Sequence, residues 1–366
     1  IQDEVAGHIA EQLELRLMKP KGPRQETDPE TYALFLKARH DFYIEPGNDA
    51  DYTDTIEMLR NAIERDPEFV PAITLLTFVL SRQSDVQALS PRQNEAINIE
   101  RGQLIERAYA LQPDDAVANL YKGYLEFMKT GDDVMGLAYL QRSLELEPSN
   151  MEVLRFAGYV ARKYGRLDDS VTLFRQALAR DPSCISCSSG LHHTLGWMGQ
   201  FEEAEAVLRR RIALTNDFGA HVNRGIVLID LGRAEEALEI FDEWEPDEDL
   251  CALFRTMALD ALGRREEADE TIEAWRDRWL EKIGPTALAG IYVGRLDAER
   301  TLEFLTMMMA ATPWSFENIV WDRRFEFLHD TDEWQKWREQ AGLDEESVSN
   351  IEFTLPDFPP TEPTTP

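Results

Sequence analysis

Stretches with the apolar periodicity of helices alternate along the chain with short turn segments that resemble one another. Most of these segments carry a glycine followed, after two residues, by two acidic residues and a small one. The glycines lie at positions 131, 165, 199, 232, 263 and 294, so the spacings between them are 34, 34, 33, 31 and 31 residues. A turn motif at so regular an interval predicts an array of helical hairpins, one hairpin per repeat.

Each part of the motif has a use in a hairpin. The glycine ends the first helix, because glycine takes a left-handed conformation without strain from a Cβ atom. The acidic pair lies in the first turn of the second helix and complements its dipole, and the small residue lets the two helices approach. A proline then closes the unit, and these prolines are Pro67, Pro113, Pro148 and Pro182. Polar insertions at 41–51 and 81–93 predict loops in the first two units.

The most regular unit runs from Met151 to Cys184. Its signature positions are Gly158, Gly165, Leu167, Ser170, Phe174, Ala177 and Pro182, at the offsets that are typical of a tetratricopeptide repeat. The sequence from about residue 28 to 312 therefore resembles a tetratricopeptide-repeat (TPR) array, although Asn216 stands where a closing proline is usual. The resemblance implies an all-α fold, a right-handed superhelical solenoid of helical hairpins, and a non-catalytic role in binding other proteins.

The two ends resemble a narrower group of proteins. Segment 2–6, with apolar residues at positions 1, 5, 9, 13 and 17, is similar to the last helix of a domain like the amino-terminal region of the translocation protein TolB. Segment 27–39 is similar to the opening of the repeat region that follows that domain. Segment 321–334, closing on 341–343, resembles the terminal repeat of these arrays, although Arg323 and Glu333 stand where proline is favoured. Such arrays occur in bacterial class III adenylate or guanylate cyclases and winged-helix regulators.

This resemblance implies an organisation for the whole chain. We expect a leading helix and linker at 1–27, the repeat array at 28–312, a helical cap at 313–343 and a disordered acidic, then Pro/Thr-rich tail at 344–366. The chain begins at Ile1 inside a helical pattern, so we expect it to be the C-terminal regulatory or scaffolding region of a longer bacterial signalling protein. Its compartment would be periplasmic if a membrane span precedes it, and cytoplasmic otherwise.

The charge of the chain narrows its partners. It carries 69 acidic and 38 basic residues, a net charge of −31, which disfavours binding to nucleic acids and to anionic membrane surfaces. Between Glu235 and Glu273 there are 15 acidic and 3 basic residues, a local net charge of 3 − 15 = −12. This stretch is either a solvated helix face or a docking surface for a basic partner. A homodimer built through the array or the cap is a further hypothesis.

Candidate chemistry is sparse. The sequence contains no phosphate-binding glycine loop, no nucleophile elbow and no zinc-protease motif, so we expect this chain to be no enzyme and to hold no cofactor. Cys184 and Cys187, with His192 and His193 nearby, form the only cluster with metal-ligand chemistry, but their spacing fits no known zinc finger. The cysteines are small residues at a repeat boundary, a disulfide, or part of a metal or cofactor site in a free-standing helical protein.

A basic patch is the strongest binding candidate. Four basic residues and no acidic ones lie between Val153 and Leu167. At the offsets that line the groove of such an array we find Arg155, Tyr159, Arg162 and Lys163, and neighbouring units add Tyr121, His193 and Trp197. These residues predict a peptide-binding groove for an acidic segment or a free C-terminal carboxylate. The alternative is that nearby acids already neutralise the patch.

Overall fold

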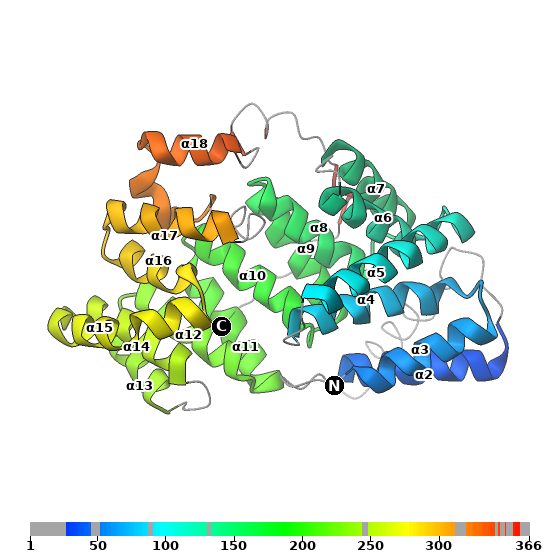
Figure 1. The fold of residues 1–366 in the computed structure, drawn as a ribbon, viewed down its shortest axis with the longest axis horizontal. Coiled ribbons are helices and arrows are strands. Elements are labelled where there is room, and N and C mark those ends of the chain that lie inside the picture. The colour runs from blue at the N-terminus through cyan, green and yellow to red at the C-terminus, as the bar shows by residue number, and fades with distance from the viewer. Residues whose placement is uncertain are drawn as a thin grey trace, which may run out of the picture. The chain divides into compact units, whose positions relative to one another are not determined.

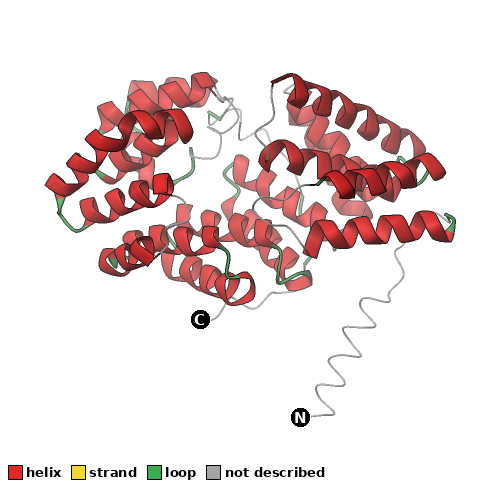
Figure 2. Ribbon diagram, turned by 60° about the horizontal axis from the view of Figure 1, so that its bottom comes forward, coloured by secondary structure: helices red, strands yellow, loops and turns green. Residues whose placement is uncertain are grey.

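The structure is a computed structural model, and it describes residues 27–44, 52–86, 91–129, 133–243, 248–311, 320–340, 343–344, 348 and 354–358. All regular elements in these ranges are helices (Figure 2), so the predicted all-α fold is confirmed. The chain divides into two compact units, residues 1–146 and 147–366. The expected leading helix and most of the expected tail lie outside the described residues.

The described part of the first unit forms three helical hairpins. They pair α2 (Pro29–Ile44) with α3 (Thr53–Arg65), α4 (Val70–Val86) with α5 (Pro91–Leu111), and α6 (Ala116–Lys129) with α7 (Asp133–Leu146). The described parts of the polar stretch 81–93, expected as a loop, are helical instead and lengthen both helices of the second hairpin. Helix α4 continues to Val86, and α5 starts at Pro91, where a proline is favoured because the first helical N–H has no partner.

The second unit holds five hairpins and a C-terminal segment (Figure 1). The hairpins are α8 (Met151–Lys163) with α9 (Leu167–Arg180), α10 (Ile185–Trp197) with α11 (Phe201–Thr215), α12 (Phe218–Asp230) with α13 (Ala234–Glu243), α14 (Glu248–Ala261) with α15 (Arg265–Lys282), and α16 (Pro285–Gly294) with α17 (Ala298–Ala311). The 3₁₀ helix η2 (Arg323–Leu328) and helix α18 (Asp332–Gln340) follow.

The turn glycines behave as the motif predicts in four hairpins of the second unit. Gly165, Gly199, Gly232 and Gly263 have φ between 72° and 74°. The last hairpin differs, because Gly294 still belongs to α16 and the left-handed residue is Leu296, with φ 52°. Asn216, which replaces a closing proline, ends α11 with φ 48°, a conformation that asparagine tolerates better than most residues.

Neighbouring helices, within a hairpin or in successive hairpins, are held close by a glycine that faces a phenylalanine ring. A Cβ atom on Gly225 of α12 would lie 2.4 Å from Phe241 Cζ of α13, and one on Gly190 of α10 would lie 2.2 Å from Phe174 Cζ of α9. These distances are far inside van der Waals contact, so only glycine fits at either position. Gly290 of α16 is different, because a Cβ atom there meets nothing within 4 Å.

We predict opposite effects for alanine at these two kinds of glycine. Gly225→Ala should destabilise the chain by about 1–3 kcal/mol, since the methyl group overpacks against Phe241. Gly290→Ala should stabilise it by about 0.5–1 kcal/mol, the usual advantage of alanine inside a helix. Urea unfolding followed by circular dichroism measures both, and equal changes in the two variants would contradict the packing described here.

Candidate functional site

Helix α8 carries most of the predicted basic patch, and one of its cations is paired within the helix. Arg155 Nη2 donates to Glu152 Oε2 at 2.7 Å, and the side chains are only 14% and 13% exposed. For Arg155, the alternative raised in the sequence analysis therefore applies: a nearby acid, Glu152, pairs with it. Recognition of a partner carboxylate by this patch remains a prediction.

Arg162 is the buried cation of the patch. Its guanidinium carbon lies 5.1 Å from the ring centroid of Tyr159 and 4.5 Å from that of Trp197, so the cation is held between two aromatic faces. The hydroxyl of Tyr159 donates to the Ser186 carbonyl at 2.7 Å, which fixes the ring. Burial lowers the pKa of Arg162 to about 10, and the group stays charged at neutral pH. The structure therefore brings three predicted residues together.

Lys163 contacts the C-terminal segment through its backbone carbonyl. Its carbonyl accepts a hydrogen bond of 2.8 Å from Trp321 Nε1, in the C-terminal segment. The indole also covers Gly165, where a Cβ atom would lie 2.8 Å from Trp321 Cε2, and Arg323 covers Gly199 in the same manner. The C-terminal segment thus contacts two successive repeat turns of the second unit.

The histidine pair lies on α10. His192 is 2% exposed, its Nδ1 lies 3.0 Å from the Ser188 carbonyl oxygen, and its ring centroid is 4.0 Å from that of the exposed His193. Burial, together with the nearby charges of Arg211 and Arg162, lowers the pKa of His192 to about 4. His192 is therefore neutral at physiological pH.

Cys184 and Cys187 are joined by a disulfide. Neither sulfur is then available as a thiolate ligand, and the residues that the structure describes contain no group of three or more His, Cys, Asp or Glu side chains placed to hold a metal. With the disulfide formed, the described residues offer no support for the hypothesised metal or cofactor site at Cys184, Cys187 and His193. Of the alternatives for the two cysteines, the structure contains the disulfide.

Tyr121 belongs to the first unit. It packs with Ile105 and Leu125 and lies 6.5 Å, between ring centroids, from Phe78. At 9% exposure it is a core residue of that unit. The other six predicted groove residues all lie on α8 and α10 of the second unit.

A cavity of ≈ 460 Å³ lies in the second unit, between the helices that begin its later hairpins and the C-terminal segment. Its wall is mainly apolar, and the side chains that form it include Ile226, Ile229, Met257, Leu305, Met308 and Phe325. A cavity of this size and character accommodates one or two large side chains of a ligand. Trp197, one of the predicted groove residues, also lines it.

The charged groups of this cavity are not equivalent. Arg324 is held by Asp322, with Nε 2.9 Å from Oδ2, and on the other side Asp260 accepts from Arg295 Nε at 2.6 Å. Asp230, at the end of α12, has no ion pair among the described residues within salt-bridge distance. Burial raises the pKa of Asp230 to about 6, against the opposing effect of the nearby Arg324 charge.

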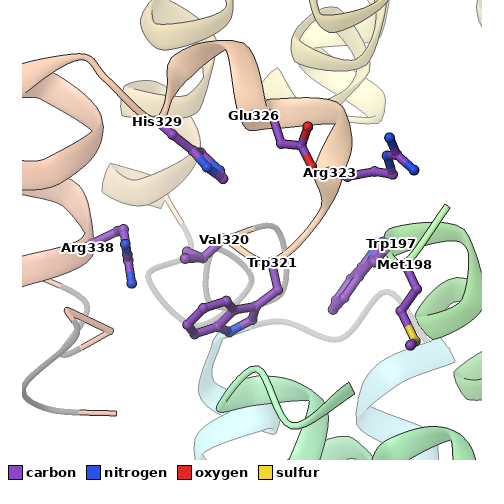
Figure 3. Close-up of a pocket in the computed structure, with 8 residues that line it drawn as sticks. All are labelled: Trp197, Met198, Val320, Trp321, Arg323, Glu326, His329 and Arg338. Carbon is purple, nitrogen blue, oxygen red and sulfur yellow. The ribbon is translucent and has the colours of Figure 1, made fainter. Parts of the chain in front are cut away.

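A second cavity of ≈ 380 Å³ lies where α10 meets the C-terminal segment. Figure 3 shows Trp197 and Met198 on one side with Arg323 above them, Arg338 on the opposite side, and Trp321 between. The guanidinium carbon of Arg338 is 5.4 Å from the ring centroid of Trp321. Trp197 lines both cavities, which makes it the residue shared by the predicted groove and the observed spaces.

Comparison with known families agrees with this architecture. Residues 136–183 and 197–249 match the model of the tetratricopeptide repeat. These two segments carry tetratricopeptide repeats. Hairpins of this kind stack into arrays that bind other proteins and are in general non-catalytic. No curated protein matches the TPR chain in sequence at a significant level. Among its described helices, none is at once long and apolar enough to cross a membrane.

Solved structures resemble this TPR chain in fold. A monomeric mutant of IFIT1 with m7Gppp-AAAA has a TM-score of 0.55 at 13% identity, over 90% of this chain and 74% of the other. The human IFIT1 dimer with m7Gppp-AAAA has a TM-score of 0.51 at 14% identity, over 93% and 76%. At such identities the likeness concerns the helical fold alone.

Sequence reasoning missed Asp230, although a signal was present. Each of the helices α8, α10 and α12 ends two residues before a turn glycine, on Lys163, Trp197 and Asp230 respectively. The offset that selected Lys163 and Trp197 therefore selects Asp230 when it is carried one repeat further. The apolar wall of the cavity could not be found in this way, because apolar residues that line a cavity have the same sequence pattern as residues packed in the core.

We predict that His192 makes the TPR chain sensitive to acid. Its pKa is about 6.5 in the unfolded chain and about 4 in the fold, so the fold keeps its full stability above pH 6.5 and loses it as pH falls toward 4. The loss from this residue should be about 3 kcal/mol, at 1.36 kcal/mol per pH unit. His192→Gln should show a shallower decline in urea-unfolding free energy over that range. A decline as steep as in the wild type would contradict the neutral, buried state of His192.

Proposed function

We propose that the second unit of this TPR chain binds a partner protein through the apolar cavity, and that the bound segment carries a large apolar side chain beside a basic one. The observation that carries the proposal is an apolar wall beside the Asp230 carboxylate, which has no ion pair within salt-bridge distance among the described residues and is acted on by the Arg324 charge from farther away. The chain itself acts as a non-catalytic interaction module.

The apolar part of the proposal follows from the wall. Ile229, Met257 and Met308 offer flexible or branched surfaces around an open space. Methionine adapts to side chains of different shape, and filling a preformed apolar pocket supplies most of the affinity of a peptide anchor. Gly290 leaves room on the α16 side, because nothing lies within 4 Å of its Cβ position.

The basic part follows from Asp230. A carboxylate whose pKa is raised to about 6 by burial is held in an unfavourable environment when it is charged. A cation from a partner relieves that cost, so a lysine or arginine is selected over a neutral side chain. The net charge of −31 also attracts a positively charged partner at long range.

The chain's own C-terminal segment already places a basic and an aromatic side chain at the cavity. Arg324 and Phe325, a basic residue followed by an aromatic one, both line the cavity. Phe325 is 7% exposed, and the charge of Arg324 acts on Asp230. A partner segment with the same two side chains would extend this arrangement into the remaining space.

Three further proposals rest on other observations. The exposed acidic side chains of α13 and α15, such as Glu235 and Glu270, support a second contact with a basic partner, although Asp242 already pairs with Arg255. The resemblance of the two ends supports a regulatory or scaffolding role within a bacterial signalling protein, such as a nucleotide cyclase or a transcriptional regulator. The basic patch of α8 supports an acidic ligand instead.

A displayed peptide library distinguishes these ligands. We predict that selection on the purified chain enriches peptides with an aromatic or aliphatic residue next to lysine or arginine. Gly290→Leu, which fills the cavity from an open helical position, should weaken the selected peptides at least tenfold. The matched control is Gly196→Leu, at a helical glycine that also has nothing within 4 Å of its Cβ position but does not line the cavity. Enrichment of acidic peptides would instead support the Arg162 and Lys163 patch, and self-association during the selection would support a homodimer.

We also predict that binding depends on pH through Asp230. Its carboxyl is protonated below about pH 6, so affinity for a basic peptide should fall as pH decreases from 7.5 to 5. Asp230→Asn should bind about tenfold or more weakly at pH 7.5, since a charged hydrogen bond contributes about 1.5–3 kcal/mol, and its affinity should be nearly flat with pH. Calorimetry on both proteins measures this, and an unchanged pH dependence in the variant would rule out Asp230 as the cation site.

A further inference from the structure

The disulfide of the second unit occupies a helix-capping position. Cys184 is the N-cap of α10, and Cys187 lies three residues later, in the first turn. The backbone N–H of Cys187 donates to the Cys184 sulfur at 3.2 Å. The sulfur thus performs the task that a side-chain oxygen performs at most helix starts.

Other repeats of the array show what this position normally holds. Asn150 Oδ1 caps α8 by accepting from Glu152 N at 3.0 Å, Asp217 Oδ1 caps α12 by accepting from Ala220 N at 3.0 Å, and Asp115 Oδ1 accepts from Ala118 N at 2.7 Å at the start of α6. Cys184 is the equivalent residue of its repeat. A thiolate on Cys184 would therefore stand where these repeats place an aspartate or asparagine oxygen.

The disulfide does little to hold the fold. It closes a loop of four residues within one turn of a single helix, whereas the stabilisation by a cross-link grows with the length of the loop it closes. Helix α10 is anchored by other means, including the Gly190 contact with Phe174 and the bond from Tyr159 to Ser186. Opening the disulfide leaves all of these contacts in place.

The two sulfurs differ in access. Cys187 is 0% exposed and its sulfur lies 4.0 Å from that of Met151, while Cys184 is 8% exposed and its sulfur lies 3.5 Å from the Ser186 hydroxyl oxygen. A reagent reaches Cys184 first. The nearby charged group, Asp181, is engaged with Ser183 through its Oδ1.

From this arrangement we propose that Cys184 and Cys187 form a reversible thiol–disulfide exchange site whose reaction partner is an external dithiol. A thiolate of the dithiol attacks the Cys184 sulfur, the Cys184–Cys187 bond breaks, and Cys187 leaves as a thiolate that takes up a proton. The second thiolate of the dithiol then attacks its own sulfur in the mixed disulfide, and Cys184 leaves. Two electrons pass to the protein, and the dithiol becomes a disulfide.

The helix start favours the reduced form of Cys184. The Cys187 N–H and the positive end of the α10 dipole both stabilise a thiolate there. A stabilised thiolate is a better leaving group and makes the disulfide easier to reduce. The proposal concerns chemistry that is independent of partner binding in the cavity.

Titration of single-cysteine variants tests the thiolate. In a Cys251→Ser background, Cys187→Ser leaves only Cys184, whose ionisation is followed by thiolate absorbance and by the pH dependence of iodoacetamide alkylation. We expect the thiol pKa of Cys184 to lie at least one pH unit below the value of the same variant unfolded in urea. Cys184→Ser leaves only Cys187, which should alkylate at least tenfold more slowly. An equal pKa in the folded and unfolded states would overturn the proposal.

Equilibration of the chain with dithiothreitol at defined ratios of its reduced and oxidised forms tests the exchange directly, without a variant in the pair. The expected result is a complete two-electron transition in both directions with an unchanged helical circular dichroism signal. Resistance to excess reduced dithiothreitol under native conditions, or loss of helix on reduction, would show a purely structural disulfide. Cys184→Asp, which restores the cap found on α12, should keep the fold and form no mixed disulfide.

Discussion

The distance between neighbouring helices, within a hairpin and between successive hairpins, is the constraint on which the second unit depends. Glycine at one position of the first helix lets a phenylalanine ring of a neighbouring helix rest against its backbone, as at Gly190 with Phe174 and Gly225 with Phe241. Any Cβ atom there would force the ring and the helix apart by about an ångström, because carbon atoms in contact lie about 3.5 Å apart. Because repeats stack on one another, such a shift would be passed to the next hairpin and would change the spacing of the helices that line the cavity.

One position of the repeat supplies several of the side chains that face the cavity. The residue two positions before the turn glycine ends the first helix of a hairpin, and it is Trp197 in α10, Asp230 in α12 and Ala261 in α14. A regular backbone therefore presents a series of different side chains at one structural position. An aromatic ring, a carboxylate and a methyl group in succession give this wall its chemical character, with no change to the fold.

The sequence carried enough information for the hairpins but less for the site. Turn glycines and closing prolines report backbone geometry directly, so Gly165, Gly199, Gly232 and Gly263 were predictable, and Leu296 was not because its left-handed conformation breaks the motif. Their offsets assigned Arg162 and Trp197 to the first helices of successive hairpins, and the Arg162 guanidinium carbon lies 4.5 Å from the Trp197 ring centroid. The Arg155 pair with Glu152 depends on rotamers, and the disulfide depends on the sulfurs meeting at a helix start, so neither follows from spacing alone.

The bond from Trp321 to the Lys163 carbonyl joins residues 158 positions apart in the chain. Nearly all other contacts of the array are between neighbours, and contacts of low sequence separation form quickly, whereas closing a loop this long costs more chain entropy. The C-terminal segment therefore docks after the hairpins have stacked, and it docks only if the turns at Gly165 and Gly199 already stand at their final separation. During synthesis, the surfaces of these two turns that Trp321 and Arg323 later cover are therefore exposed to solvent until the C-terminal segment has been translated.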